Sequence, residues 1–320
     1  MNRLLGNESR WHENVVGHRA DEGAEKPASR GSVVSVWGPT GAPGRTSVAI
    51  ELATELALTG VSVVLVDADT YGGSVSAYLE LFDETPGFLA LARLAESGAC
   101  DEVQRKRLIH TCALGAVRLD VLTGLVNPAR WPELSHRRST AALEYLREHY
   151  DFTIVDVGFN LEEDEEISSD LLAPRRNQAT IAALRSSDLV VAVGGSDVVG
   201  LARYIHALTQ LQQVVPDAQV LHVINRLRRT GALSSAASTV SSTLRRFAGL
   251  DEVVLVDEDI RAFDAAAVAG VPLCVAAPNV SSRKQLAQLA GKVLNRVGHH
   301  HRDAGAAPRR RGFSKERAAG

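Results

Sequence analysis

The sequence is poor in cysteine and aromatic residues, and it has no long apolar run. Its three cysteines, Cys100, Cys112 and Cys274, lie far apart and form no CxxC pair. This spacing argues against a zinc site or a disulfide framework and fits a reducing compartment. The first residues lack the apolar core of a signal peptide, and no segment approaches the ~18 apolar residues of a membrane span. We therefore expect a soluble, cytoplasmic protein that meets a membrane only at a surface.

The sequence also has no large excess of positive or negative charge. Lysine and arginine number 35 against 38 acidic residues, a formal net charge of -3, so the chain as a whole is not a polyanion binder by composition. A chain of 320 residues that is 45% hydrophobic fits one large α/β domain. We predict a flexible leader at residues 1–30, a single domain at 31–297 and a basic, disordered tail at 298–320.

Between these ends, short β-branched runs alternate with helical segments. The runs are nearly continuously apolar, which is typical of parallel strands that helices cover on both faces. The sequence therefore predicts an α/β fold with a doubly wound, mainly parallel sheet of seven or eight strands, whose ligands bind beyond the carboxyl ends of the strands. The predicted strands are 33–36, 61–66, 119–122, 152–155, 189–193, 220–224 and 253–256. The predicted helices are 46–58, 140–149, 179–185, 201–214, 236–247, 260–269 and 283–297.

A glycine- and proline-rich turn follows the first strand, and an amphipathic helix follows the turn directly. Small residues let the backbone approach a phosphate closely, and successive N–H groups at a helix N-terminus attract an anion. Alone, the turn is weak evidence, because an ordinary strand-to-helix turn has similar residues. The candidate phosphate-binding residues are Gly38, Thr40, Gly41, Ala42, Pro43, Gly44, Arg45, Thr46 and Ser47.

Aspartates end two further apolar strands. Asp67 and Asp69 follow the second strand in the segment VVLVDAD, and Asp156 ends the segment FTIVDVG. Carboxylates at these places can hold Mg²⁺ or its bound water and can orient an attacking water. Taken singly, Asp67 and Asp69 are better explained as turn or cap residues, and Asp156 alone is a weak signal. Their order along the chain, each at the end of a predicted central strand, favours a common nucleotide site.

With these motifs in place, residues 31 to 297 resemble the deviant-Walker-A ATPases of the ParA/MinD family, which have a SIMIBI-type P-loop NTPase fold. The family has KGGxGKT[ST] after the first strand, then DxD, then an apolar strand ending in aspartate. Here GPTGAPGRTS, DAD and VDVG occupy those places. Two later segments strengthen the resemblance: Asn225 and Arg226 stand at the family's strand-ending NR, and Asp257 begins a segment similar to the one that closes over the base.

The resemblance implies ATP and Mg²⁺ as ligands and a nucleotide-dependent homodimer. It implies metal contacts from Thr46, Asp67 and Asp156, and catalytic roles for Asp69 and Arg45. It further implies a protein partner in chromosome-partitioning, septum or pilus machinery. Within the family the chain is most similar to the CpaE/TadZ branch linked to Flp-type pilus assembly.

The chain departs from the family pattern at the loop. Pro39 replaces the first P-loop glycine, Thr40 stands in place of the signature lysine and Arg45 in place of the P-loop lysine. Losing a cation near the phosphates removes transition-state stabilisation, so ATP hydrolysis stays open. One alternative is a non-hydrolysing scaffold for pilus or septum assembly. Another is a DNA-associated partitioning protein that binds through scattered arginines such as Arg226 and Arg228.

Overall fold

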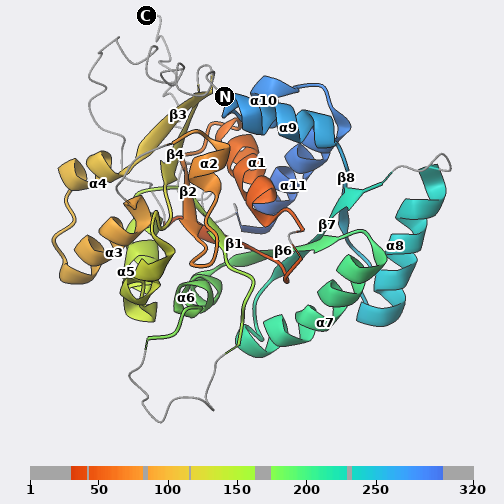
Figure 1. Cartoon of the computed structure of the whole chain (residues 1–320), viewed down its shortest axis with the longest axis horizontal. Helices are drawn as coiled ribbons and strands as arrows, with labels where there is room; N and C mark the ends of the chain where they lie inside the picture. The colour runs from red at the N-terminus through yellow and green to blue at the C-terminus, as the bar shows by residue number, and fades with distance from the viewer. Residues whose placement is uncertain are drawn as a thin grey trace, which may run out of the picture.

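A computed structural model describes residues 30–41, 43–81, 86–114, 117–162, 174–228 and 233–297. Within these residues the chain forms one eight-stranded sheet with the order β3-β4-β2-β5-β1-β6-β7-β8 (Figure 1). Neighbouring strands are parallel except β3 and β4, which pair antiparallel at one edge. The strands are β1 Ser32–Trp37, β2 Val63–Ala68, β3 His110–Leu114, β4 Val117–Leu122, β5 Phe152–Val157, β6 Leu189–Gly195, β7 Val220–Leu227 and β8 Val254–Asp257.

Helices cover both faces of the sheet, above and below it in the view of Figure 1. One face carries α1 Arg45–Ala57, α9 Ile260–Ala269, α10 Leu273–Ala276 and α11 Ser281–Val297. The other carries α3 Gly87–Ser97, α5 His136–Arg147, α6 Gln178–Ser186, α7 Val198–Val214 and α8 Leu233–Ala248. The shorter elements are α2 Val75–Tyr78, α4 Glu102–Leu108 and the 3₁₀ helix η1 Pro128–Glu133.

The sheet is buried on both sides because its central strands carry apolar side chains on both faces. In β1, Val34 and Val36 pack into the core beneath α1 and α11, whereas Val33 and Trp37 pack into the core on the opposite face. Every residue of β1 is buried. Successive side chains of a strand point to opposite faces, so a continuous apolar run supplies two cores at once.

The predicted α/β fold with a mainly parallel sheet is confirmed. The sequence did not predict strand β3, the antiparallel member of the sheet, or helices α3 and α4. Apart from residue 30, the predicted leader and tail lie outside the described residues. None of the helices in the described ranges combines the length and the apolar character needed to cross a bilayer.

Candidate functional site

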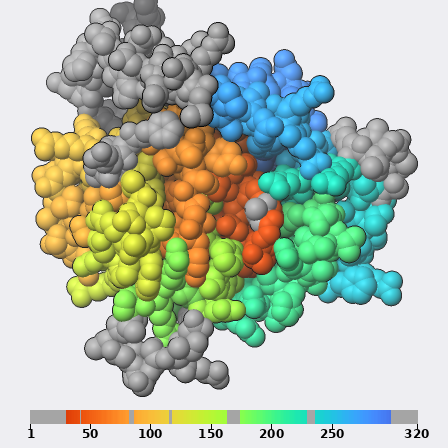
Figure 2. All heavy atoms as spheres, in the orientation of Figure 1, coloured from red at the N-terminus to blue at the C-terminus, as the bar shows by residue number. Residues whose placement is uncertain are grey.

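The strand order brings three chain segments to one place. Strands β2, β5 and β1 are neighbours, so the turns that follow them meet at the carboxyl edge of the sheet. Asp156 in β5 lies opposite Asp67 in β2 and opposite Val36 in β1. Atoms of the β1–α1 segment reach the surface at the centre of the face in Figure 2, between the orange residues that follow β2 and the green residues of α7.

Gly44 shapes the start of α1. Its backbone is left-handed, with φ 90°, and it caps the helix without any side-chain hydrogen bond. A Cβ atom there would lie 2.5 Å from Nδ2 of Asn225, so both conformation and space require glycine. The Asn225 amide donates instead to the carbonyl oxygen of Pro43 at 2.9 Å. The turn therefore leads into a helix whose first N–H groups have no side-chain cap, the arrangement that binds anions.

Thr46, in the first turn of α1, contacts the end of β5. Its hydroxyl donates to Oδ2 of Asp156 at 2.7 Å, and the Ser74 hydroxyl donates to Thr46 Oγ1 at 3.3 Å. Asp156 is buried, and its Oδ1 has no hydrogen-bond partner among the described residues. Burial, with the nearby carboxylate of Asp67, raises the pKa of Asp156 well above its usual value. A buried carboxylate with an unused oxygen beside a hydroxyl matches the ligands that Mg²⁺ prefers.

Backbone groups surround the carboxylate of Asp67 more closely than that of Asp156. Its two oxygens accept hydrogen bonds from the N–H groups of Asp69 at 3.1 Å and Val75 at 3.2 Å. A Cβ atom on Gly73 or Gly124 would lie 2.8 or 2.7 Å from this carboxyl group. Burial raises the pKa of Asp67 to about 7, although these hydrogen bonds oppose the shift. Both Asp67 oxygens are thus engaged, unlike those of Asp156.

Asp69 and Arg45 lie beside the loop and contact each other. Asp69 accepts hydrogen bonds from the N–H groups of Tyr71 at 2.8 Å and Gly72 at 3.2 Å. The Arg45 guanidinium reaches Asp69 Oδ2 at 3.4 Å and also donates to the carbonyl oxygens of Gly38 at 3.1 Å and Pro39 at 3.3 Å. Arg45 therefore folds back over its own loop.

The second half of the predicted site surrounds a cavity of about 320 Å³ beside the start of α1. Asn225, Arg226 and Asp257 line it together with Gly44 and Ser47. The Asp257 carboxylate accepts hydrogen bonds from the hydroxyl of Ser281 at 2.9 Å and the amide of Gln285 at 3.0 Å. Arg226 is one of the non-glycine residues with positive φ, at 59°. Residues that the sequence analysis assigned to a base-binding site therefore share one cavity with the loop.

One cation near the loop was not predicted. Arg203 of α7 lines a cleft of about 220 Å³ together with Thr40, Gly41 and Arg226. No sequence motif connects Arg203 with the loop. Arg203 comes close to it because α7, which follows β6, packs beside the loop. Ala42, the remaining predicted loop residue, lies outside the described residues.

Across the described residues, no three acidic, histidine or cysteine side chains gather closely enough to hold a metal ion by themselves. The arrangement around Thr46 and Asp156 instead offers one hydroxyl and one free carboxylate oxygen. Such a pair holds Mg²⁺ where a phosphate and water complete the coordination.

No protein-family model and no curated protein sequence matches the chain. Several solved structures, in contrast, are similar to the chain. A ParA family ATPase from Chlorobium tepidum TLS matches with a TM-score of 0.65 and 15% identity, over 81% of this chain and 97% of that one. The septum site-determining protein MinD from Pyrococcus horikoshii OT3, complexed with Mg-ADP, matches with a TM-score of 0.62 and 17% identity, over 84% and 98%.

A putative plasmid partition protein from Borrelia burgdorferi B31, bound to AMPPNP, matches with a TM-score of 0.61 and 15% identity, over 83% of this chain and 100% of that one. At this level of identity the match concerns the fold. The chain is structurally similar to ParA/MinD family ATPases and shares their α/β fold with a mainly parallel sheet.

Proposed function

We propose that the chain binds ATP with Mg²⁺ at the carboxyl edge of the sheet and uses the nucleotide as a switch for a homodimer that positions or partitions cellular machinery. One observation carries this proposal: left-handed Gly44 caps the start of α1, and the first turn of this helix places the Thr46 hydroxyl on buried Asp156. The similar structures from Pyrococcus horikoshii and Borrelia burgdorferi, which hold Mg-ADP and AMPPNP, support a nucleotide as the ligand.

Each part of the site then has a role. The loop from Gly38 to Ser47 and the N-terminus of α1 bind the phosphates. Thr46 and Asp156 would hold Mg²⁺, which would supply positive charge to the phosphate oxygens. Asp67, the third predicted metal contact, accepts backbone N–H groups with both oxygens and would reach the ion through a bound water. Asn225, Arg226 and Asp257 line the cavity for the base. Asp69, which its own turn holds in place, orients a water molecule.

The Arg45 guanidinium has to leave the carbonyl oxygens of Gly38 and Pro39 for the phosphates to enter. These contacts are 3.1 and 3.3 Å long, and an ionised phosphate is a stronger acceptor than a carbonyl. Arg45 is therefore released by the ligand it will bind. Arg203, on the other side of the loop, replaces part of the positive charge that Thr40 lacks.

The switch is tested by size-exclusion chromatography of the purified chain without nucleotide, with Mg-ADP and with Mg-ATP. We expect a dimer with Mg-ATP alone and a monomer otherwise. The same elution volume in all three conditions, together with no binding of a fluorescent ATP analogue, contradicts the proposal.

A non-hydrolysing scaffold of pilus or septum assembly is the second candidate, and the neutral Thr40 favours it. A cation that stabilises the transition state is missing at that position. A phosphate-release assay separates the two functions: a chain that binds ATP and dimerises without releasing phosphate is the scaffold. The pilus-associated CpaE/TadZ type remains our proposal for the machinery, on the loop sequence alone.

A further inference from the structure

A chain of cation and aromatic contacts connects the start of α1 with the residues just before α6. The Arg45 guanidinium lies 6.0 Å from the ring centre of Phe159, which follows β5, and the rings of Phe159 and Tyr71 are 5.0 Å apart. The Arg176 guanidinium lies 4.5 Å from the ring centre of Tyr71. These separations are within the range in which such groups attract one another. We call Arg45, Phe159, Tyr71 and Arg176 the cation–aromatic stack.

Hydrogen bonds fix the Arg176 end of the stack to the turn after β2. Nε and Nη2 of Arg176 donate to the carbonyl oxygen of Thr70 at 3.1 and 3.0 Å. In return, the Thr70 hydroxyl donates to the carbonyl oxygen of Arg176 at 2.7 Å. The Asn160 amide donates to the Tyr71 hydroxyl at 3.1 Å. Tyr71 and Arg176 are therefore held in place by bonds that do not involve Arg45.

The Arg45 end of the stack is held less completely. Only 13% of the Arg45 side chain is exposed, yet its Nε has no hydrogen-bond partner among the described residues. The guanidinium contacts the Phe159 ring, the Asp69 carboxylate at 3.4 Å and the two loop carbonyl oxygens. A buried donor without an acceptor costs free energy, and phosphate oxygens are strong acceptors. Arg45 is therefore the member of the stack that an anion at the loop can displace.

Phe159 is also connected to the last residue of β1. The indole N–H of Trp37 donates to the carbonyl oxygen of Phe159 at 3.2 Å, and the Trp37 side chain is buried. A shift of Phe159 therefore alters the hydrogen bond of a buried indole. This contact gives the position of Phe159 a spectroscopic signal inside the molecule.

We propose that the cation–aromatic stack is an autoinhibitory contact: Phe159 holds Arg45 over its own loop, and phosphates at the loop draw Arg45 away and release Phe159. The ring and the nucleotide then compete for one guanidinium, so the contact shifts the balance between the two arrangements of Arg45. The inference rests on the proposed nucleotide site. It also fixes a sign, because loss of the competing ring should strengthen nucleotide binding, whereas loss of a merely structural ring should weaken it.

The affinity for a fluorescent ATP analogue with Mg²⁺ is the first test. Phe159→Leu should bind the analogue about 2–5-fold more tightly than the wild type, the range expected when one cation–aromatic contact no longer competes. Phe159→Tyr keeps the ring and should bind as the wild type does. Circular dichroism confirms that both variants are folded.

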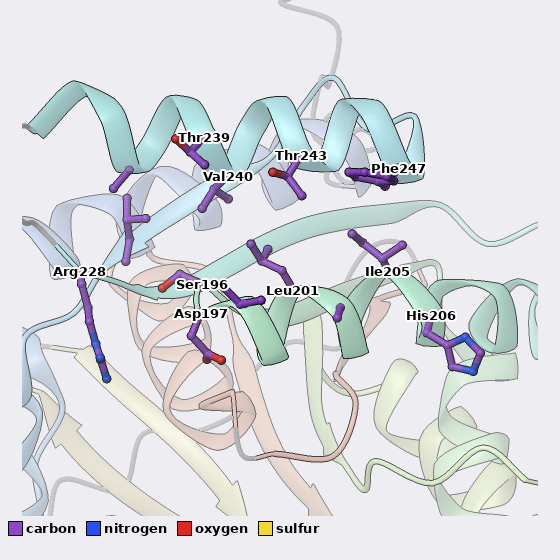
Figure 3. A pocket seen from close by; sticks show the side chains of 14 residues that line it. Ser196, Asp197, Leu201, Ile205, His206, Arg228, Thr239, Val240, Thr243 and Phe247 are labelled. Carbon is purple, nitrogen blue, oxygen red and sulfur yellow. The ribbon is translucent and has the colours of Figure 1, made fainter.

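Phe247→Leu is the matched control. Phe247 lies at the end of α8 beside the groove between α7 and α8 (Figure 3), and it lines neither the cavity for the base nor the cleft beside the loop. Its ring also contacts a guanidinium, that of Arg246 at 5.1 Å. The same substitution of leucine for phenylalanine should leave the affinity for the ATP analogue unchanged there.

A double-mutant cycle tests whether the gain passes through Arg45. Arg45→Met removes the guanidinium and should itself weaken binding. In this background Phe159→Leu should bring no gain, because there is no longer a cation to release. A gain of equal size in both backgrounds means that Phe159 acts through another residue, and it overturns the proposal.

Trp37 supplies a second readout that needs no change at Phe159. The chain has three tryptophans, so Trp11→Phe combined with Trp131→Phe leaves Trp37 alone. Its emission should change with saturating Mg-ATP and with inorganic tripolyphosphate, but not with adenosine, because only phosphate oxygens draw Arg45 away. The change should disappear in Arg45→Met. A constant emission with ATP bound, or a change that persists in Arg45→Met, contradicts the proposal even if Phe159→Leu does not fold.

Failure of the stack and failure of the nucleotide site give different results. If the wild type does not bind the ATP analogue, the proposed function is wrong and the autoinhibitory contact is wrong with it. If the wild type binds the analogue and a folded Phe159→Leu binds it equally or more weakly, the nucleotide site stands and only the role of the stack is wrong.

Discussion

Nη1 of Arg203 lies 2.6 Å from the position that a Cβ atom on Gly41 would occupy. Helix α7 therefore places a guanidinium directly against the loop, next to Thr40, where ParA/MinD ATPases have a lysine. We expect Arg203→Ala to weaken ATP binding by about 3–10-fold and ADP binding by less, because the terminal phosphate adds negative charge at the loop. Titration with fluorescent ATP and ADP analogues measures both affinities.

The control for this prediction is Arg137→Ala on α5, whose side chain is 82% exposed and which should leave both affinities unchanged. Adding Thr40→Lys to the Arg203→Ala variant should restore the preference for ATP, because it returns a cation to the same part of the loop. If Arg203→Ala binds both nucleotides as the wild type does, Arg203 only packs against Gly41.

Thr46 offers a second prediction, because its hydroxyl is the sole donor seen on Asp156 in the described residues. Thr46→Ala should reduce the affinity for ATP about 10- to 100-fold in the presence of Mg²⁺ and much less in its absence, since the lost group belongs to the metal site. Thr46→Ser keeps the hydroxyl and should bind nearly normally. Equal losses with and without Mg²⁺ would assign Thr46 to the phosphates alone.

The central strands could be predicted because each is apolar on both faces. β1, β2, β5 and β6 read as continuous apolar runs, and those runs are buried in full or nearly so. Strand β3 gives no such signal: in it only Cys112 and Leu114 are buried, and its pairing with β4 is a tertiary contact. The run from Phe88 to Ala92 in α3 is apolar but does not separate helix from strand by periodicity.

The candidate site was predictable where its residues stand at strand ends or in the glycine-rich turn that leads into α1. Asp67 and Asp156 are 89 positions apart, yet strand order alone makes β2 and β5 neighbours. The position of Arg203 against Gly41 and the bond from Asn225 to Pro43 depend on how side chains pack between distant elements. Local patterns carry no information on such contacts, so they appear only in the folded chain.

Gly44 and Gly60 give a matched pair of glycine substitutions. Both have positive φ, 90° and 93°, but a Cβ atom on Gly60 meets nothing within 4 Å, whereas one on Gly44 meets Asn225. Gly60→Ala should cost about 1 kcal/mol of folding free energy and leave nucleotide affinity intact. Gly44→Ala should cost about 2–3 kcal/mol and abolish nucleotide binding, because the loop must move away from Asn225. Urea unfolding and nucleotide titration distinguish the two effects.

Glu51 in α1 makes the stability of the fold depend on pH. Its side chain is buried at 3% exposure, Oε1 accepts the N–H of Leu273 at 2.9 Å, and Oε2 has no partner among the described residues. Burial raises the pKa of Glu51 from 4.5 to about 8. Between these two values the unfolded chain has released a proton that the folded chain still holds, so stability falls as pH rises through this window and levels off above about 8.

Glu51→Gln removes the titrating carboxyl group and keeps an oxygen atom that can accept the N–H of Leu273. We expect the variant to be more stable than the wild type by about 1–3 kcal/mol at pH 8 and no more stable at pH 4.5, as measured by urea unfolding across that range. Glu55→Gln is the control, because Glu55 pairs with Arg283 at 2.7 Å and its loss should destabilise the fold. An identical pH dependence in wild type and Glu51→Gln would mean that Glu51 is ionised in the folded chain, and that water reaches Oε2 between α1 and α10.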